Sequence, residues 1–366
     1  MKKTLISASV ASILAATSFS SMAQDPTFYG RLDVSVANSS NGYGTMSSND
    51  NGQGGTVLEN NASMIGVKGA QNIADNLDIV YKVEVGANGF NNSNPFSARA
   101  TWIGLKTAAG TAIIGREDSV FKASEGKVDA FGNGNSDIDK LLPGQGRESD
   151  VINYYSPKIA DLVSVNASYV LTDSLGGGKY AESDNAYAAN ITFGDKGMKA
   201  QPFYAAAAYV DGIEDVKAYR GVVTGKLAGA TLGFLYQNSE SVKSDVDLKG
   251  NTYIASATYP VGNFLLKAQY GQDDSGLGKF ATAFGDGNLD ASGDKMYDMQ
   301  KDIEDFDLKY FAIGANYNLA SNAYVYAYYT KFDGDFSLKL SNPTTPATNT
   351  VDMKDDMFTL GIRYTF

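Results

Sequence analysis

The chain has 366 residues, with 30 Lys and Arg against 41 Asp and Glu, and it contains neither His nor Cys. Their absence excludes a Ser-His-Asp triad, a histidine-ligated metal, a thiol nucleophile and a disulfide scaffold. The net charge of −11 argues against nucleic acid as a partner, because phosphate binding needs a basic surface. We therefore expect no enzyme activity, no metal and no cofactor.

The N-terminal segment, residues 1–23, has the pattern of a cleaved secretory signal. Lys2 and Lys3 precede an apolar stretch, and Ser21-Met22-Ala23 forms a small-x-small cleavage site. The apolar stretch has about 16 residues, whereas a membrane-spanning helix needs about 20. We predict export, with residues 24–366 forming a single mature domain of the bacterial envelope.

The mature chain is a series of segments in which apolar and polar residues alternate, as in β-strands with one apolar face. The final strand shows this most clearly, with apolar residues at every second position from Phe358 to Phe366. Including 28–36, 162–172 and this last strand, we predict about sixteen strands. The others lie at 61–70, 77–88, 96–107, 111–117, 147–156, 185–195, 199–210, 218–227, 230–241, 250–260, 263–273, 304–319 and 321–333.

The connections between these strands alternate between short turns and long polar loops. Short turns are expected near Asn76, Gly110, Gly229, Gly262 and Ser321, and long loops at 39–60, 118–146, 274–303 and 334–354. This asymmetry is typical of an outer-membrane barrel with periplasmic turns, and only a closed barrel satisfies all strand hydrogen bonds in lipid. The sequence thus predicts an all-β transmembrane antiparallel barrel.

Aromatic residues near the predicted strand ends support a membrane location. Tyr154, Tyr259 and Tyr317 suit the headgroup layer, and the single tryptophan, Trp102, precedes a periplasmic turn. We interpret these residues as parts of the two aromatic girdles.

Several motifs, in this order, resemble general diffusion porins of the Gram-negative outer membrane, of the OmpC/OmpF-like or OmpU-like kind. The motifs are Phe28-Tyr29-Gly30-Arg31-Leu32-Asp33, Gly66-Val67-Lys68-Gly69, Arg99-Ala100-Thr101-Trp102-Ile103-Gly104-Leu105-Lys106, Ile114-Gly115-Arg116 and Gly361-Ile362-Arg363-Tyr364-Thr365-Phe366. The resemblance implies a homotrimer of sixteen-stranded barrels in contact with outer-membrane lipid and lipopolysaccharide. It also implies passage of ions and small hydrophilic solutes, a constriction formed by the inward-folded loop 118–146, and a terminal Phe366 read by the barrel-assembly machinery.

Charged residues on the polar strand faces would line such a pore and set its ion preference through a transverse field. The predicted wall cations are Arg31, Lys68, Lys82, Arg99, Arg147 and Arg363, and Arg220 and Lys267 share their strand phase. The predicted acidic residues of the constriction are Glu117, Asp118, Glu125 and Asp129.

This sequence departs from the family pattern at two places. Met64 stands where the family often has an arginine, and Asp129-Ala130 replaces Pro-Glu before Phe131-Gly132. Loss of a wall cation beside retained loop carboxylates predicts a preference for cations.

Three other functions are compatible with parts of the pattern. A solute-specific channel would have more strands or an aromatic track along its lumen. An outer-membrane enzyme of the phospholipase type would need a catalytic histidine, which is absent. An adhesin or phage receptor could coexist with a pore through loops such as 39–60 and 334–354.

Overall fold

The computed structural model describes residues 26–46, 52–90, 94–171, 186–287, 301–338 and 350–366, so the predicted signal at 1–23 lies outside it. No helix in these ranges has the length and apolar character needed to cross a membrane. The strands are β1 (Thr27–Ser39), β2 (Gly55–Asn60), β3 (Met64–Ala74), β4 (Leu77–Ala87), β5 (Phe96–Thr107), β6 (Gly110–Asp118), β7 (Arg147–Tyr155), β8 (Val163–Val170), β9 (Tyr187–Gly194), β10 (Phe203–Asp211), β11 (Val216–Leu227), β12 (Ala230–Ser241), β13 (Lys249–Val261), β14 (Phe264–Asp273), β15 (Ile303–Ala320), β16 (Ala323–Leu338) and β17 (Thr350–Thr365). The short helices are α2 (Val120–Ala123), η1 (Ile138–Lys140), η2 (Ile213–Asp215) and α3 (Lys279–Gly287).

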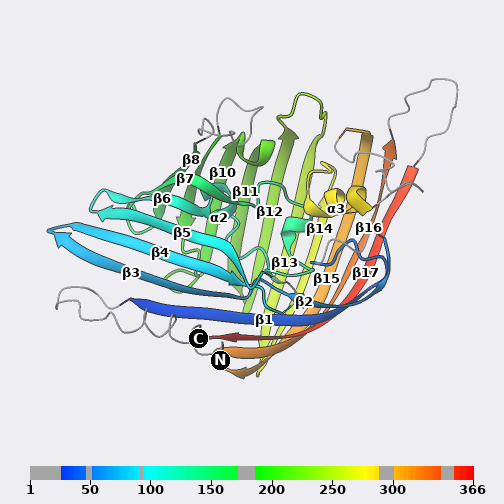
Figure 1. The fold of residues 1–366 in the computed structure, drawn as a ribbon, viewed down its shortest axis with the longest axis horizontal. Coiled ribbons are helices and arrows are strands. Elements are labelled where there is room, and N and C mark those ends of the chain that lie inside the picture. Colours follow the sequence, from blue (N-terminus) through cyan, green and yellow to red (C-terminus); the bar gives the residue numbers. More distant parts are fainter. Residues whose placement is uncertain (1–25, 47–51, 91–93, 172–185, 288–300, 339–349) are drawn as a thin grey trace, which may run out of the picture.

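The strands pair with their neighbours in an antiparallel ring that closes between β1 and β17 (Figure 1). At this seam Arg31 lies opposite Thr365 and Ser39 opposite Met357. On its other side, β1 pairs first with β3 and then with β2, which together make one position of the ring. The seventeen segments of the described chain therefore form a closed barrel of sixteen strands, as predicted.

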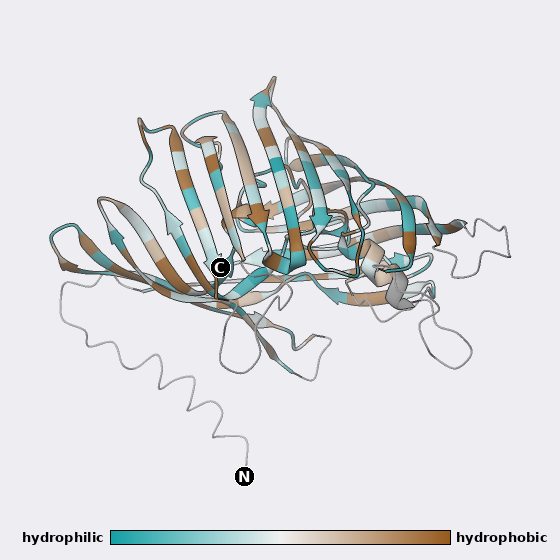
Figure 2. Ribbon diagram, turned by 90° about the horizontal axis from the view of Figure 1, so that it is seen from above, coloured by the Kyte–Doolittle hydropathy of each residue, from teal (hydrophilic) through white to brown (hydrophobic). Residues whose placement is uncertain are grey.

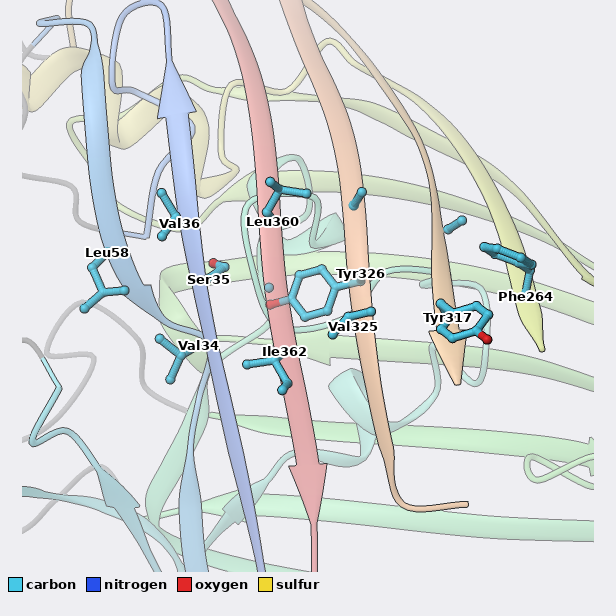
Figure 3. A pocket seen from close by; sticks show the side chains of 13 residues that line it. Val34, Ser35, Val36, Leu58, Phe264, Tyr317, Val325, Tyr326, Leu360 and Ile362 are labelled. Carbon is cyan, nitrogen blue, oxygen red and sulfur yellow. The ribbon is translucent and has the colours of Figure 1, made fainter. Parts of the chain in front are cut away.

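Alternation of side chains gives the barrel an apolar outer face and a polar lumen, visible as alternating colours along the strands in Figure 2. On β17, Leu360 and Ile362 are exposed on the outer face, whereas Met357 and Thr359 are buried on the lumen side. This matches the predicted phase. Around the closing seam, residues of β1, β2 and β14–β17, most of them with outward side chains, line an apolar hollow of roughly 570 Å³ (Figure 3). The hollow lies on the outer face of the barrel.

Regular structure extends into all four predicted long loops: 118–146 contains α2 and η1, and 334–354 contains the end of β16 and the start of β17. The predicted loop 39–60 includes β2, which is separated from β3 by a bend at Asn61-Ala62-Ser63. The backbone of Asp33 on β1 forms hydrogen bonds with this bend. Its carbonyl accepts from the Asn61 N–H (2.9 Å), and its N–H donates to the Ser63 hydroxyl (2.9 Å). The positive φ of Ala62 (60°) marks the irregular backbone that alternation alone did not reveal.

The predicted loop 274–303 contains α3, which lies against the loop end of β14–β16 (Figure 1). Phe280 stacks on Phe332 with ring centroids 4.3 Å apart, and Phe284 packs on Tyr43 at 4.4 Å. Two aromatic residues four positions apart lie on one face of a helix, so α3 is anchored by that face.

The apolar core lies inside the barrel, between segment 119–146 and the wall. Apolar side chains of this segment pack in two clusters: the larger includes residues of β10–β13 and β15–β17, and in the other Val120 and Phe121 pack with residues of β7–β11. The segment contributes Val128, Phe131, Ile138, Leu141 and Leu142. Arg220 and Lys267 are buried beside this core on β11 and β14, and the other predicted wall cations lie on β17, β1 and β3–β7.

Candidate functional site

The wall of β17, β1 and β3–β7 has a hydrogen-bonded network centred on Glu84 of β4. The Arg99 Nε on β5 donates to Glu84 at 2.7 Å, and the Tyr29 hydroxyl on β1 donates at 2.9 Å. The Lys82 Nζ, two positions away on the same strand face, lies 3.8 Å from the same carboxylate. Two predicted wall cations are thus held by a carboxylate that the motifs did not single out.

Glu117 of β6 continues this network. It accepts from the Lys82 Nζ at 3.3 Å and from the Trp102 indole N–H at 2.7 Å. Trp102 lies opposite Lys82 in the β4–β5 pairing, so its ring is on the lumen side. The assignment of Trp102 to an outer aromatic girdle is therefore wrong, because the residue shares the phase of the lumen cations.

A second ion pair lies at the closing seam. The Arg363 Nε donates to the Asp33 carboxylate, which also accepts from the Tyr326 hydroxyl at 2.8 Å. Arg31 donates through Nη2 to the Ala62 carbonyl at 2.7 Å, so its charge meets a neutral acceptor.

The remaining predicted wall cations lie at the two ends of the same wall. The Arg147 Nε is 3.1 Å from Asp118, and the Lys122 Nζ is 3.8 Å from that carboxylate. The Lys68 ammonium lies 5.3 Å from the centroid of the Tyr29 ring.

Segment 119–146 crosses the lumen on the opposite side. Its first arm follows β9 and β11, where Asn190 donates to the Val120 carbonyl at 2.6 Å. The Arg220 guanidinium lies 4.0 Å above the Phe121 ring and donates to the Phe121 carbonyl at 3.1 Å. Arg220 therefore holds the loop instead of facing open water.

The returning arm is fixed to β14 and β2. The Ala130 N–H donates to the Gln269 side chain at 2.8 Å, and the Asn135 amide donates to Glu59 at 2.7 Å. The segment thus spans the barrel from one wall to another, and both arms have polar partners on the lumen face.

The four predicted constriction carboxylates occupy two different environments. Glu117 and Asp118 belong to the end of β6, not to the loop, and both lie beside wall cations. Glu125 and Asp129 lie on the loop, and the Asp129 carboxylate accepts the N–H groups of Phe131 (3.1 Å) and Gly132 (2.9 Å).

Crowding by the protein changes the protonation of the two loop carboxylates. Desolvation and the nearby Asp137 raise the pKa of Glu125 to about 7, although Arg220 acts against the shift. Desolvation and Glu125 raise the pKa of Asp129 to about 7, against two backbone hydrogen bonds. Each is therefore only partly charged at neutral pH.

A family model described as Gram-negative porin matches residues 9–337. The chain belongs to the Gram-negative porin family. This porin is 27% identical over 287 residues to the major outer membrane protein P.IB of Neisseria meningitidis serogroup A, covering 74% of this chain and 81% of that protein.

Two solved structures resemble the fold of this porin. The anion-selective porin from Comamonas acidovorans has a TM-score of 0.63 and 17% identity, with 93% of this chain and 99% of that chain covered. OmpT of Vibrio cholerae in a trimer form has a TM-score of 0.57 and 16% identity, with 93% and 99% covered. At these identities the likeness shows the fold alone.

The family and the fold establish what kind of protein this porin is. It is an outer-membrane β-barrel channel for passive diffusion, and not an enzyme. The resemblance drawn from the sequence motifs is confirmed.

The residues that the motifs missed are the wall carboxylates and their neutral partners. Glu84 lies two positions from Lys82, so strand phase could have placed it in the lumen of this porin. Its contact with Arg99 depends on a register shift between Val83 and Val85, which no local pattern reveals.

Proposed function

We propose that this porin is a general diffusion pore with a moderate preference for cations, and that its path runs along the wall of β17, β1 and β3–β7. Ions and small hydrophilic solutes would pass between this wall and segment 119–146. Field effects from wall and loop charges, not chemical steps, would discriminate among them.

The observation that carries this proposal is the pairing of wall cations with carboxylates of the same wall. The six cations Arg31, Lys68, Lys82, Arg99, Arg147 and Arg363 share the wall with Asp33, Glu84, Glu117 and Asp118. The strong transverse field expected from wall cations facing loop carboxylates is thereby reduced, because much of the positive charge is compensated locally.

Charge at the extracellular end favours cations further. The halves of β15, β16 and β17 next to the long loops (303–311, 331–338 and 350–357), which we call the acidic rim, carry eight carboxylates and three lysines. Asp307, Asp335 and Asp352 lie directly opposite one another across the three strands. An acidic rim raises the local concentration of cations.

The test is the zero-current potential of the purified porin in a planar bilayer with a tenfold KCl gradient. A potential that corresponds to a K⁺ permeability several times that of Cl⁻ supports the proposal. A potential near zero, or of the sign produced by Cl⁻, contradicts it.

We extend the proposal to assembly. A homotrimer is supported by the trimer form of a structural relative. The terminal residue pairs with β1 through Gly30, with N–H to carbonyl distances of 2.8 and 3.0 Å, which places Phe366 at the closing seam. This position suits a role as the signal for barrel assembly, and the apolar belt and charged rim suit phospholipid and lipopolysaccharide. After cross-linking, a band at three times the mass of one chain on a denaturing gel would support the trimer. A band at the mass of one chain alone would refute it.

A solute-specific channel with an aromatic track is disfavoured by the position of the lumen aromatics. Tyr326 and Tyr328 stack on β16 with centroids 4.6 Å apart, but both are buried. Phe131 of the loop meets Tyr328 edge to face at 4.9 Å. These rings hold the loop and do not present a surface to solutes.

A further inference from the structure

The turn between β9 and β10, at the end of the barrel with the short turns, is built around one carboxylate. The Asp195 side chain accepts the backbone N–H groups of Gly197, Lys199 and Ala200, each at 2.8 Å. These bonds hold the pKa of Asp195 at about 2, so the group stays ionised. This turn spans residues 195–202, whereas the β11–β12 turn beside it spans only residues 228–229 and the β7–β8 turn spans residues 156–162.

Lysines from three other parts of the chain converge on this turn. They come from the β7–β8 turn, from β11 and from segment 119–146, and a turn lysine reaches the segment in return. The donor and acceptor pairs are Lys158 to the Gly194 carbonyl (3.0 Å), Lys226 to Met198 (2.8 Å), Lys127 to Gly197 (2.9 Å) and Lys196 to Ala123 (2.7 Å). A fifth lysine, Lys199, lies in the turn itself.

All five lysines are exposed, and the four ammonium groups that donate within this region do so to neutral carbonyl oxygens. Within the described ranges, none of the five has a carboxylate oxygen within 4.0 Å. Asp195 and Asp161 are the carboxylates of the two turns, and Glu125 of the segment lies near Lys196 but also near Arg220. We define the lysine cluster as Lys127, Lys158, Lys196, Lys199 and Lys226.

The lysine cluster is unusual for a chain with a net charge of −11, and it contrasts with the acidic rim at the other end of the barrel. Lys226 shares the lumen phase of Thr224, and Lys127 belongs to the segment inside the barrel. These two lysines therefore place positive charge on the lumen side of the periplasmic end, along the arc of the barrel from β7 to β11. Low-dielectric walls around a mouth of one sign concentrate ions of the opposite sign.

We infer that the lysine cluster makes the periplasmic mouth a binding site for small multivalent anions that carry phosphate or carboxylate groups. An ammonium group with one neutral partner keeps other N–H donors for an anion. A multivalent anion such as tripolyphosphate can engage several lysines at once, whereas chloride cannot. The acidic rim offers no such site. Multivalent anions should therefore bind and obstruct the path when they are added on the periplasmic side.

The experiment adds inorganic tripolyphosphate to one compartment of a bilayer that holds oriented channels in 0.1 M KCl. We expect half-block of the K⁺ current at a concentration about tenfold lower from the periplasmic side than from the extracellular side. The difference should disappear in 1 M KCl, where the Debye length is about 3 Å. Since the chain has no cysteine, Thr350→Cys at the extracellular end provides a single thiol that reports orientation.

The decisive variant is Lys158→Gln with Lys199→Gln and Lys226→Gln. It keeps Lys127 and Lys196, which tie the segment to the turn, and we expect it to lose the sidedness of the block. The matched control, Lys309→Gln with Lys331→Gln and Lys354→Gln, removes three lysines of the acidic rim and should keep it.

Equal block from both sides in the unmodified porin, or unchanged sidedness in the decisive variant, would overturn the inference. The salt dependence of the block in the unmodified porin tests the inference even if the variant does not fold. Ion preference is measured separately in KCl without tripolyphosphate, so failure of the inference and failure of the proposed function are distinguishable.

Discussion

Removal of two wall carboxylates tests whether local pairing sets the ion preference. The double variant Glu84→Gln with Glu117→Gln keeps the size of both side chains and their ability to accept from Arg99 and Trp102. It leaves Lys82, which now lies 3.8 and 3.3 Å from these carboxylates, without a compensating charge.

The size of the effect follows from Coulomb's law with screening. An ion that passes about 7 Å from a charge in water gains or loses about 0.6 kcal/mol. At 0.1 M salt a Debye length of about 10 Å reduces this to about 0.3 kcal/mol. Two lost charges then lower the local cation concentration about 2.7-fold and raise the anion concentration equally, since RT is about 0.59 kcal/mol. The cation-to-anion permeability ratio should fall about sevenfold.

The assay is the zero-current potential in a KCl gradient, compared with the unmodified porin. The matched control is Glu240→Gln with Glu304→Gln, because both carboxylates are on exposed residues and Glu240 pairs with Lys217 at 3.1 Å. The control should change the ratio by less than twofold. A double variant with an unchanged potential, or with a stronger cation preference, would refute the assignment of the path to this wall.

Three further predictions follow from single features. The unmodified porin should lose thermal stability as pH falls from about 4 to about 2, because the pKa of Asp195 in the folded state lies below the ordinary 3.8. Asp195→Asn should lack this contribution, and the melting temperature measured against pH checks it. Gly30→Val should reduce the yield of closed barrel on a heat-modifiability gel, since an added Cβ would lie 2.3 Å from the terminal ring, whereas Gly221→Ala, with open space, should fold normally. Cation preference should rise between pH 6 and pH 8 as Glu125 and Asp129 ionise, and Glu125→Gln with Asp129→Asn should abolish that rise; an equal rise in this variant would contradict the role of these groups.

The strands could be predicted from the sequence because their signal is local. The alternation from Phe358 to Phe366 repeats every two residues, and lipid on one side with water on the other imposes that period directly. The same argument gave the correct lumen phase to Arg31, Lys82 and Arg99.

The partners of these cations could not be predicted, because they depend on the register between strands. Irregularities near Val83 and near Gly115 shift the alignment of β4–β5 and of β6–β7 by a residue. A one-residue shift decides whether Glu117 meets Trp102 and Lys82, and no residue type marks the bulge in advance. The fold of segment 119–146 is likewise set by distant residues such as Arg220 and Gln269.

The reach of segment 119–146 affects how this pore resists current. The segment begins at the extracellular end of β6, yet Lys127 and Ala123 exchange hydrogen bonds with the β9–β10 turn at the periplasmic end. For the path proposed above, this reach predicts a narrow part that extends along the barrel axis as a lane, and not a thin diaphragm. For equal cross-section, the electrical resistance of a lane grows with its length. A substitution that widens the lane at one level should therefore change the conductance little. Release of the segment from the turn should change the conductance more, because it widens the whole lane.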